Sequence, residues 1–400
     1  MNIKNFNSLR SQMGNEALEL AARLNPREED FLRLYQIIER KFPPEIVRAA
    51  LEIAILRGEA GKKFPFADRM FFTREALQQA SGWEVATYRA DRYAGFDRIL
   101  DLGCSIGGDT LALARMAPTI GVDIDELRLV MAKSNVENLD LPNRVDFIRA
   151  NLIDGLPFAL SSPAEKTALF FDPARREGEK RIFSVANYRP PLYLIQDWIK
   201  DFPSLGVKIS PGVDYREIQS YKAEVEFISV RGELKEAVLW FGSFCTVPRR
   251  ATLLPGRYTL TGENPESLPL SAPQSFIYEP DPAVLRAGLV ALLGSRIGAY
   301  QLDPTIAYLT NDQWVKTPFA RVWKIEDWFP FGLKRLRTYL RERRVGSVTI
   351  KKRGSPLVPE TLIRELRLQG DEERVVFLTQ LMGKPIVIVA YREILDSQLE

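Results

Sequence analysis

Residues 98–109 read Arg-Ile-Leu-Asp-Leu-Gly-Cys-Ser-Ile-Gly-Gly-Asp, an apolar run that enters a turn of small residues. The next six residues, 110–115, have the composition of a helix, so a strand, a tight turn and a helix are predicted in that order. Backbone N–H groups at the start of that helix would face whatever lies over Gly103, Ser105 and Gly107. The stretch therefore predicts the first βα unit of an α/β domain with a nucleoside-binding turn.

The position of Asp101 selects among nucleotide ligands. In the dinucleotide-binding fingerprint the glycines receive a pyrophosphate, which a preceding carboxylate would repel. A carboxylate at this position suits a ligand with positive charge near its ribose. S-adenosylmethionine carries an ammonium and a sulfonium and is the common nucleoside of that kind. The sequence therefore predicts S-adenosylmethionine as the cofactor, bound by Asp101, Gly103, Ser105 and Gly107.

Two further strand ends complete the predicted cofactor site. Residues 119–123 form a short apolar run that ends in Asp123, about twenty residues on, where an acid that binds ribose hydroxyls is expected. Residues 144–149 are a predicted third strand, followed by Asn151 and Leu152. The Asn151 amide can pair with an adenine edge, and the N–H of Leu152 can reach a ring nitrogen. Taken singly, Asp123 is equally compatible with an ordinary helix N-cap.

These positions resemble the class I S-adenosylmethionine-dependent methyltransferases, whose first motif is commonly D-x-G-x-G-x-G. Ser105 stands in place of the middle glycine. The resemblance implies that Asp101 and Gly103 serve the amino-acid end of the cofactor, that Asp123 serves the ribose, and that Asn151 holds the adenine amine. It also implies a Rossmann-like, seven-stranded α/β sheet ending in an antiparallel hairpin, which the alternating runs 223–230 and 236–242 fit.

Residues 167–172 form an apolar run followed by Pro-Ala-Arg-Arg, the pattern of a buried parallel strand opening into a loop at its carboxyl end. In the resembled methyltransferases this loop carries a fourth motif, often D/N-P-P-aromatic, beside the transferring methyl group. Here only the acid and the first proline match. The candidate catalytic residues are Asp172, Pro173 and Arg175, and the candidate substrate contacts are Arg176 and Tyr188. The alternative is a capped loop with solvated arginines and ordinary aromatic packing.

The chain has 400 residues, no histidine, and only the cysteines 104 and 245. Without histidine, Ser–His and Cys–His catalysis and most zinc sites lack a base or a ligand, so neither a hydrolase nor a metal site is predicted. Two cysteines are too few for a disulfide framework and are compatible with a reducing cytoplasm. No apolar run approaches the length of a membrane span and no export signal is visible, so a cytoplasmic protein without a membrane partner is expected.

Four segments are predicted. Residues 1–92 form a helical domain, in which Thr73 is expected to cap a helix. Residues 93–247 form the Rossmann-like methyltransferase domain, with a fifth strand near 206–209 in which Lys208 can face solvent. Residues 248–326 form a linker and a ferredoxin-like α+β domain, whose helix at 281–293 begins with an N-cap acid followed by proline. Residues 327–400 form a basic, THUMP-like α+β domain.

Nine cations and one acid, Glu342, lie between residues 334 and 353. This excess suits a polyphosphate partner, although a solvated helix face partly neutralised by the acids at 371–373 is the alternative. The candidate RNA contacts are Lys334, Arg335, Lys351, Lys352 and Arg353. The run Thr-Ile-Lys-Lys-Arg-Gly-Ser-Pro at 349–356 and the Asp-Pro-Ala-Arg-Arg loop resemble bacterial proteins that carry a THUMP-like domain after a ferredoxin-like one. That resemblance implies a structured RNA, such as tRNA or rRNA, as the acceptor.

The sequence thus predicts an S-adenosylmethionine-dependent methyltransferase that acts on a nitrogen or oxygen of RNA. Two alternatives stay open, a small-molecule methyltransferase and a non-catalytic RNA-binding module on a methyltransferase scaffold. Neither the methylated atom nor the oligomeric state is indicated by the sequence.

Overall fold

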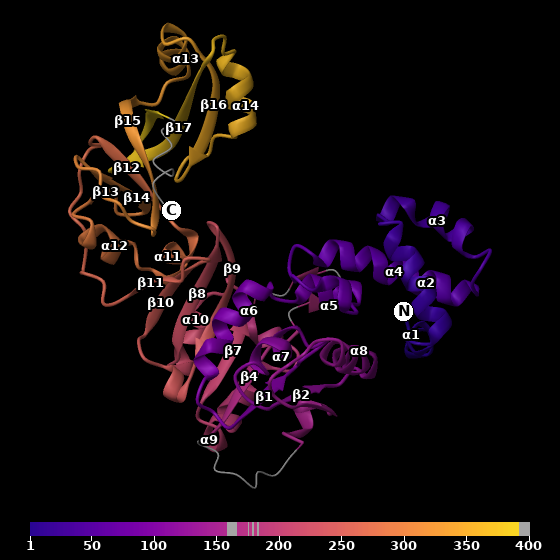
Figure 1. Cartoon of the computed structure of the whole chain (residues 1–400). Helices are drawn as coiled ribbons and strands as arrows, with labels where there is room; N and C mark the ends of the chain where they lie inside the picture. Colours follow the sequence, from indigo (N-terminus) through magenta and orange to yellow (C-terminus); the bar gives the residue numbers. More distant parts are fainter. Residues whose placement is uncertain (158–165, 175, 178–179, 182–183, 392–400) are drawn as a thin grey trace. The chain divides into compact units, whose positions relative to one another are not determined.

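The computed structural model describes residues 1–157, 166–174, 176–177, 180–181 and 184–391 (Figure 1). The chain divides into two compact units. The first comprises Met1–Val225 and Glu236–Pro248, and the second comprises Glu226–Lys235 and Arg249–Glu400.

The first unit begins with helices whose caps are readable in the sequence. They are α1 (Ile3–Leu9), α2 (Gln12–Arg23), α3 (Phe31–Ile38), α4 (Pro44–Ala60), α5 (Arg74–Gln79) and α6 (Trp83–Ala90). The Thr73 side chain accepts a hydrogen bond from the Ala76 N–H, which confirms it as the N-cap of α5. Pro44 occupies the first turn of α4, where its missing N–H costs nothing.

The N-terminal helices share one apolar core with the residues around the turn at 103–107. That core joins residues of α1 to α5 to Ile106, Leu111 and Met131. Asn135 reinforces the connection, because its buried amide accepts from the Phe71 N–H at 2.6 Å and donates to the carbonyls of Phe71 and Ile106. The helical segment is therefore packed directly against the elements that carry the predicted site.

A mostly parallel sheet follows in the first unit. Its strands are β1 (Arg98–Leu102), β2 (Thr119–Asp123), β3 (Val145–Arg149), β4 (Thr167–Phe171), β7 (Leu205–Ile209) and β9 (Glu233–Trp240), in the order β9-β7-β4-β1-β2-β3. Only β9 runs antiparallel to its neighbour β7. The connecting helices are α7 (Gly108–Leu113), α8 (Glu126–Glu137), α9 (Ile195–Asp201) and α10 (Tyr215–Ile218). Because the carboxyl ends of β1, β2, β3 and β4 share one edge, their polar residues gather there.

A short antiparallel pair, β5 (Arg176–Glu177) and β6 (Lys180–Arg181), follows β4 in the chain. The hairpin of β8 (Glu224–Val230) and β9 closes the α/β part of the sequence, as expected, and its tip belongs to the second unit. The helical N-terminal region and the parallel sheet confirm the predicted α/β fold class.

The second unit is built on mostly antiparallel strands. β10 (Arg249–Leu254) pairs with β11 (Tyr258–Thr261), and α11 (Pro282–Ala287) and α12 (Val290–Arg296) follow. The Asp281 side chain accepts from the Ala283 N–H with Pro282 in the first turn, which confirms the predicted helix start. The remaining elements are β12 (Phe276–Pro280), β13 (Tyr300–Asp303), β14 (Ile306–Asn311), β15 (Ala320–Pro330), α13 (Leu333–Glu342), β16 (Val345–Lys352), α14 (Pro359–Leu366), β17 (Glu372–Leu381) and β18 (Lys384–Tyr391).

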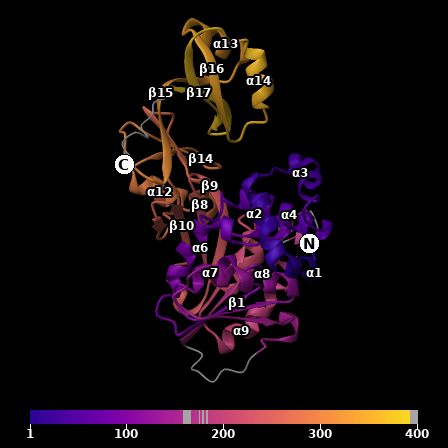
Figure 2. The same cartoon turned by 45° about the vertical axis from the view of Figure 1, so that its right-hand side comes forward.

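Within the described residues the strands from β12 to β18 form one sheet in the order β13-β14-β12-β15-β18-β17-β16, in which β16 and β17 are parallel. One apolar cluster, which includes Leu336, Leu340 and Leu362, lies where α13 and α14 cover β16 (Figure 2). A second cluster, which includes Ile277, Tyr308 and Phe377, packs β12, β14 and β17 together. Strand β15 runs through position 326/327, where the sequence suggests a boundary, so one sheet serves both predicted C-terminal segments.

Candidate active site

The turn between β1 and α7 needs residues without bulky side chains. Gly103 and Gly107 have φ of +82° and +83°, and Ser105 has φ of +50°. A Cβ on Gly103 would lie 2.7 Å from the backbone oxygen of Asp172, closer than non-bonded atoms approach. The turn can therefore bring β1, α7 and the strand end at Asp172 together only with glycine at position 103.

Asp101 lies at the carboxyl end of β1 and is fully buried. Its Oδ2 accepts from the Thr110 hydroxyl at 2.5 Å, whereas its Oδ1 is buried without a hydrogen-bond partner among the described residues. Burial raises the pKa of this carboxyl well above its ordinary value, and the neighbouring charge of Asp109 adds to the rise. A buried carboxylate oxygen that lacks a donor fits the ammonium group of S-adenosylmethionine.

Asp123 ends β2 beside the same turn. Its Oδ2 accepts from the Ser105 N–H and its Oδ1 from the Asp125 N–H, both at 2.9 Å. Burial raises the pKa of Asp123, although these two N–H groups oppose the rise. Each carboxylate oxygen has a second lone pair, so the group can still accept from ribose hydroxyls.

Asn151 and Leu152 follow β3. The Asn151 Oδ1 accepts from the Ile153 N–H at 3.2 Å and caps the short 3-10 helix Leu152–Asp154. Its amide nitrogen remains a donor suited to an adenine edge, and Leu152 is buried beneath it. The residues named for the cofactor thus lie at the ends of three adjacent strands.

Asp172 follows β4, and its N–H bonds to the Leu102 carbonyl at 3.0 Å. Its Oδ2 lies 2.6 Å from the ammonium group of Lys208, which is buried in β7. The expectation that Lys208 can face solvent is wrong, because the Asp172 carboxylate draws this side chain into the sheet edge. Pro173 is buried. Arg175 lies outside the described residues, and Arg176 is placed only as backbone in β5.

Tyr188 is buried beneath this edge, and its hydroxyl accepts from the Ser210 N–H at 2.9 Å. The backbone of Arg189 pairs with that of Ala174, so the chain between them returns to the end of β4. Tyr188 therefore lies next to the strand ends and bonds to the residue that follows β7. Little of its side chain is exposed for contact with a substrate.

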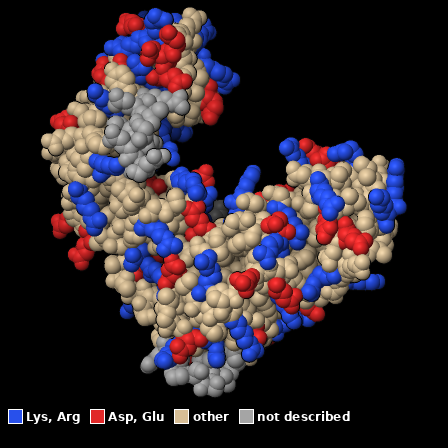
Figure 3. All heavy atoms as spheres, in the orientation of Figure 1, with Lys and Arg blue, Asp and Glu red and all other residues tan. Residues whose placement is uncertain are grey.

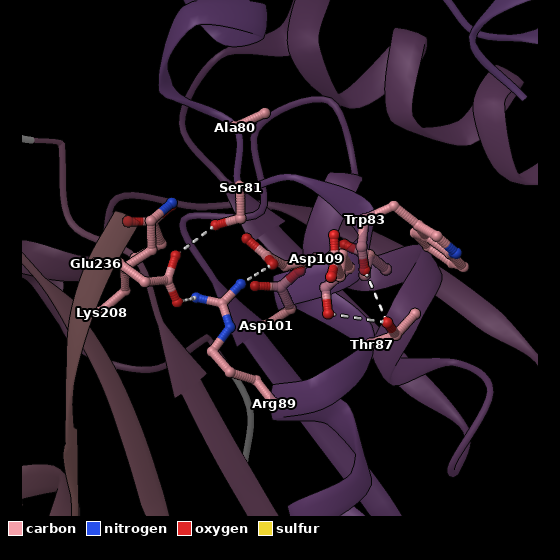
Figure 4. A network of polar contacts seen from close by, with 12 residues as sticks. Ala80, Ser81, Trp83, Thr87, Arg89, Asp101, Asp109, Lys208 and Glu236 are labelled. Carbon is pink, nitrogen blue, oxygen red and sulfur yellow. Dashed lines mark hydrogen bonds and ion pairs between the residues drawn. The ribbon is translucent and has the colours of Figure 1, made fainter. Parts of the chain in front are cut away.

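A buried polar network that sequence reasoning missed lies beside Asp101 (Figure 4). Arg89 of α6 pairs with Asp109 of α7 and contacts Glu236 of β9 at 2.7 Å. Glu236 also accepts from the Ser81 hydroxyl at 3.0 Å. Burial alone would lower the pKa of Arg89, but neighbouring negative charges, foremost Asp109 and Glu236, outweigh burial and raise it. The network joins the N-terminal helices, the cofactor turn and the antiparallel strand.

The C-terminal end of α5 and the residues between α5 and α6 also lie near this network (Figure 4). The ammonium of Lys63 donates to the carbonyls of Leu77 and Ala80 at 2.7 and 2.9 Å, and Lys208 donates to the Gln79 carbonyl at 3.3 Å. Lys63 therefore holds the C-terminal end of α5 and the residue that follows it in position.

The basic residues of the second unit are placed on and around α13 and β16. Lys351 and Arg353 face Glu279 at 2.5 and 3.9 Å, and Arg343 and Arg344 pair with Glu326 and Asp371. Space-filling atoms show blue and red side chains interspersed over α13, α14 and β16 (Figure 3). Within the described part of the chain, no carboxylate pairs with three of the candidate RNA contacts, Lys334, Arg335 and Lys352. Lys352 bonds to the Leu357 carbonyl, and Arg335 lies over the Phe329 ring.

Parts of the chain match known protein families. Residues 96–179 match the family described as RNA cap guanine-N2 methyltransferase, and residues 320–392 match the family described as THUMP domain-like. Residues 2–60 match a domain of unknown function. None of the helices in the described residues is long and apolar enough to cross a membrane.

An uncharacterized S-adenosylmethionine-dependent methyltransferase of Mycobacterium tuberculosis is 35% identical over 347 residues, which cover 84% of this chain and 93% of that protein. The trimethylguanosine synthase of Schizosaccharomyces pombe is 24% identical over 129 residues, 31% of this chain and 54% of that one. A solved structure from Porphyromonas gingivalis shares the fold over 95% of this chain and 99% of its own, with a TM-score of 0.78 and 22% identity.

The chain therefore belongs to the S-adenosylmethionine-dependent methyltransferases. Within that class it joins a methyltransferase domain to a C-terminal THUMP-like domain.

Proposed function

We propose that this methyltransferase transfers the methyl group to a nitrogen or oxygen of a structured RNA. When bound, S-adenosylmethionine supplies an electrophilic methyl group on a sulfonium centre. The observation that carries the proposal is the presence, in one chain, of residues matching an RNA cap guanine-N2 methyltransferase family and residues matching a THUMP-like family. The first description names RNA, and the resemblance to THUMP domains implies it. A cytoplasmic location remains a prediction from the sequence.

In this proposal the cofactor lies over the ends of β1, β2 and β3. The Asp101 carboxylate meets the ammonium group, Asp123 accepts from the ribose, and Asn151 with Leu152 receives the adenine. The support for the first assignment is the unpartnered, buried Oδ1 of Asp101. The turn residues Gly103, Ser105 and Gly107 leave room for the ligand.

The acceptor is assigned to the end of β4. Asp172 accepts a hydrogen bond from the acceptor atom, and the backbone fixed by Pro173 sets the angle of that contact. Arg175 and Arg176 remain candidate donors to the acceptor on sequence grounds alone. The exposed Lys334, Arg335 and Lys352 are proposed to contact RNA phosphates.

The test is transfer of labelled methyl from S-adenosylmethionine into separated RNA, protein and small-molecule fractions from cells. The intact chain is compared with Asp123→Ala and Asp172→Ala. Label in RNA that is lost with both substitutions supports the proposal. Label only in small molecules would favour a small-molecule methyltransferase, and cofactor binding with no label in any fraction would favour an RNA-binding module.

A further inference from the structure

Lys208 places a buried ammonium group beside the carboxylate of Asp172. Its side chain is 2% exposed, and Nζ lies 2.6 Å from Oδ2 of Asp172. Lysine is almost never fully buried unless it is paired, so this contact explains how an apolar strand accommodates the charge. A pairing at the end of β4 places the lysine next to the proposed acceptor position.

The geometry leaves one oxygen of Asp172 for another contact. The carboxylate is 21% exposed, and in the described chain only its Oδ2 takes part in a hydrogen bond. Burial is the main cause of the raised pKa of Asp101, and the charge of Asp172 contributes to it, so the two carboxylates act on one another. Lys208 is the cation that pairs directly with Asp172, and the charge of Arg89 also acts on that carboxylate.

A second contact fixes Lys208 itself. Its Nζ donates to the Gln79 carbonyl at 3.3 Å, and Gln79 is the last residue of α5, whose C-terminal end Lys63 also holds. The ammonium group therefore has two fixed acceptors from different elements, and its position is set from both sides. The sequence gives no local sign of this contact because Gln79 and Lys208 are far apart in the chain.

We propose that Lys208 is a positioning residue, whose ammonium group holds the Asp172 carboxylate so that Oδ1 faces the atom that accepts the methyl group. This inference rests on the acceptor role proposed for Asp172. The acceptor N–H or O–H donates to Oδ1. As the acceptor lone pair bonds to the methyl carbon, the electrons of the methyl–sulfur bond stay on sulfur, and the acceptor proton passes to Oδ1 and then to water.

The test uses two cofactor analogues and the full chain. Sinefungin carries an ammonium where S-adenosylmethionine carries its methyl group, and S-adenosylhomocysteine carries nothing there. Calorimetry compares the wild-type chain with Lys208→Met, Asp172→Asn and the double variant. We expect each single substitution to weaken sinefungin binding about tenfold, the value of one charge-assisted hydrogen bond, with S-adenosylhomocysteine binding unchanged. The double variant should bind sinefungin no more weakly than either single variant, because Lys208 acts through Asp172.

Lys200→Met is the matched control, since Lys200 contacts Asp197 at the same 2.6 Å but on an exposed helix surface. It should leave both affinities unchanged. Wild-type or tighter sinefungin binding by Lys208→Met overturns the inference, as does a further loss of sinefungin affinity when Lys208→Met is added to Asp172→Asn. Weakened S-adenosylhomocysteine binding in Lys208→Met would show that Lys208 maintains the structure of the whole site and does not specifically position Asp172. Wild-type sinefungin binding by Asp172→Asn would refute the proposed acceptor role itself, and no outcome depends on which RNA is methylated.

Discussion

At the scale of single residues, the candidate site is distinguished by carboxylates that are buried away from solvent. Asp101 and Asp123 are both buried, and burial raises the pKa of each. In the unfolded chain these groups titrate near pH 4. Between that pH and the raised folded pKa, the folded state keeps a proton that the unfolded chain has released. The free energy of unfolding of the ligand-free protein therefore falls as pH rises through this window.

Asp101→Asn should flatten this pH dependence, because the amide has no proton to lose. Denaturant unfolding of the ligand-free chain from about pH 4 to about pH 8 measures the slope in both proteins. The wild-type curve should descend more steeply. S-adenosylmethionine affinity should fall at least about tenfold in the variant, since the amide cannot make the charge-assisted hydrogen bond to the ammonium. Parallel pH curves for the two proteins would contradict the assignment of Asp101.

Asp172→Asn should separate binding from transfer. The cofactor residues are untouched, so S-adenosylmethionine affinity should stay within about twofold of wild type, while methyl transfer into RNA falls about 100-fold, as when one positioned transition-state contact is removed. Asp197→Asn, at an exposed lysine pair, is the control and should have no effect. Equal losses in cofactor affinity and in transfer would place Asp172 in the cofactor site.

At the scale of elements, the turn between β1 and α7 depends on a glycine with two separate constraints. Gly103→Ala is destabilising for two reasons. The alanine would be strained by the positive φ, at a cost of about 1–2 kcal/mol. Its Cβ would also lie 2.7 Å from the Asp172 backbone oxygen. Overpacking of that kind costs roughly a further 1–3 kcal/mol and would displace the strand end. Gly95→Ala, with φ of +91° and no atom within 4 Å of the new Cβ, isolates the strain alone.

Urea unfolding of the two alanine variants gives the comparison. Gly95→Ala should lose about 1–2 kcal/mol with cofactor binding intact. Gly103→Ala should lose more and should bind S-adenosylmethionine weakly. Equal losses with equal cofactor affinities would show that the close approach of the turn to Asp172 has no consequence.

Short sequence patterns predict those structural features that depend on residues adjacent in the chain. The strand–turn–helix at 98–113, the caps at Thr73 and Asp281 and the strand ends at Asp123 and Asp172 follow from adjacent residues, and the structure has each. Arg89, Lys208 and Glu236 were missed because their partners are distant in the chain. A signal existed, since a charge inside an apolar strand, as at Lys208 and Glu236, indicates a buried pair.

At the scale of the whole molecule, each unit carries its own part of the proposed function. The first unit holds the residues proposed to bind the cofactor and a helical segment that shares an apolar core with the turn between β1 and α7. The second unit carries the exposed cations that pair with no carboxylate among the described residues. Four of the nine cations between residues 334 and 353 pair with carboxylates of the second unit, at Glu279, Glu326 and Asp371. RNA binding by this unit should therefore depend on a few residues.

Charge reversal at Lys334, Arg335 and Lys352 should weaken binding to total cellular RNA. The slope of log affinity against log salt concentration should become shallower by about one for each phosphate that the protein no longer neutralises. Affinity for S-adenosylmethionine should not change. Reversal at Arg144, Lys200 and Arg216, exposed cations of the first unit, is the control. An equally large drop in RNA affinity in the control triple would show that binding is not localised to α13 and β16.

The most direct measurement of the central claim is mass spectrometry of nucleosides from the RNA of cells with and without this gene. One methylated nucleoside should disappear on deletion, return with the wild-type gene, and stay absent with Asp172→Asn. An unchanged set of methylated nucleosides in the deleted strain, or full restoration by Asp172→Asn, would contradict the proposal that this methyltransferase acts on RNA through the end of β4.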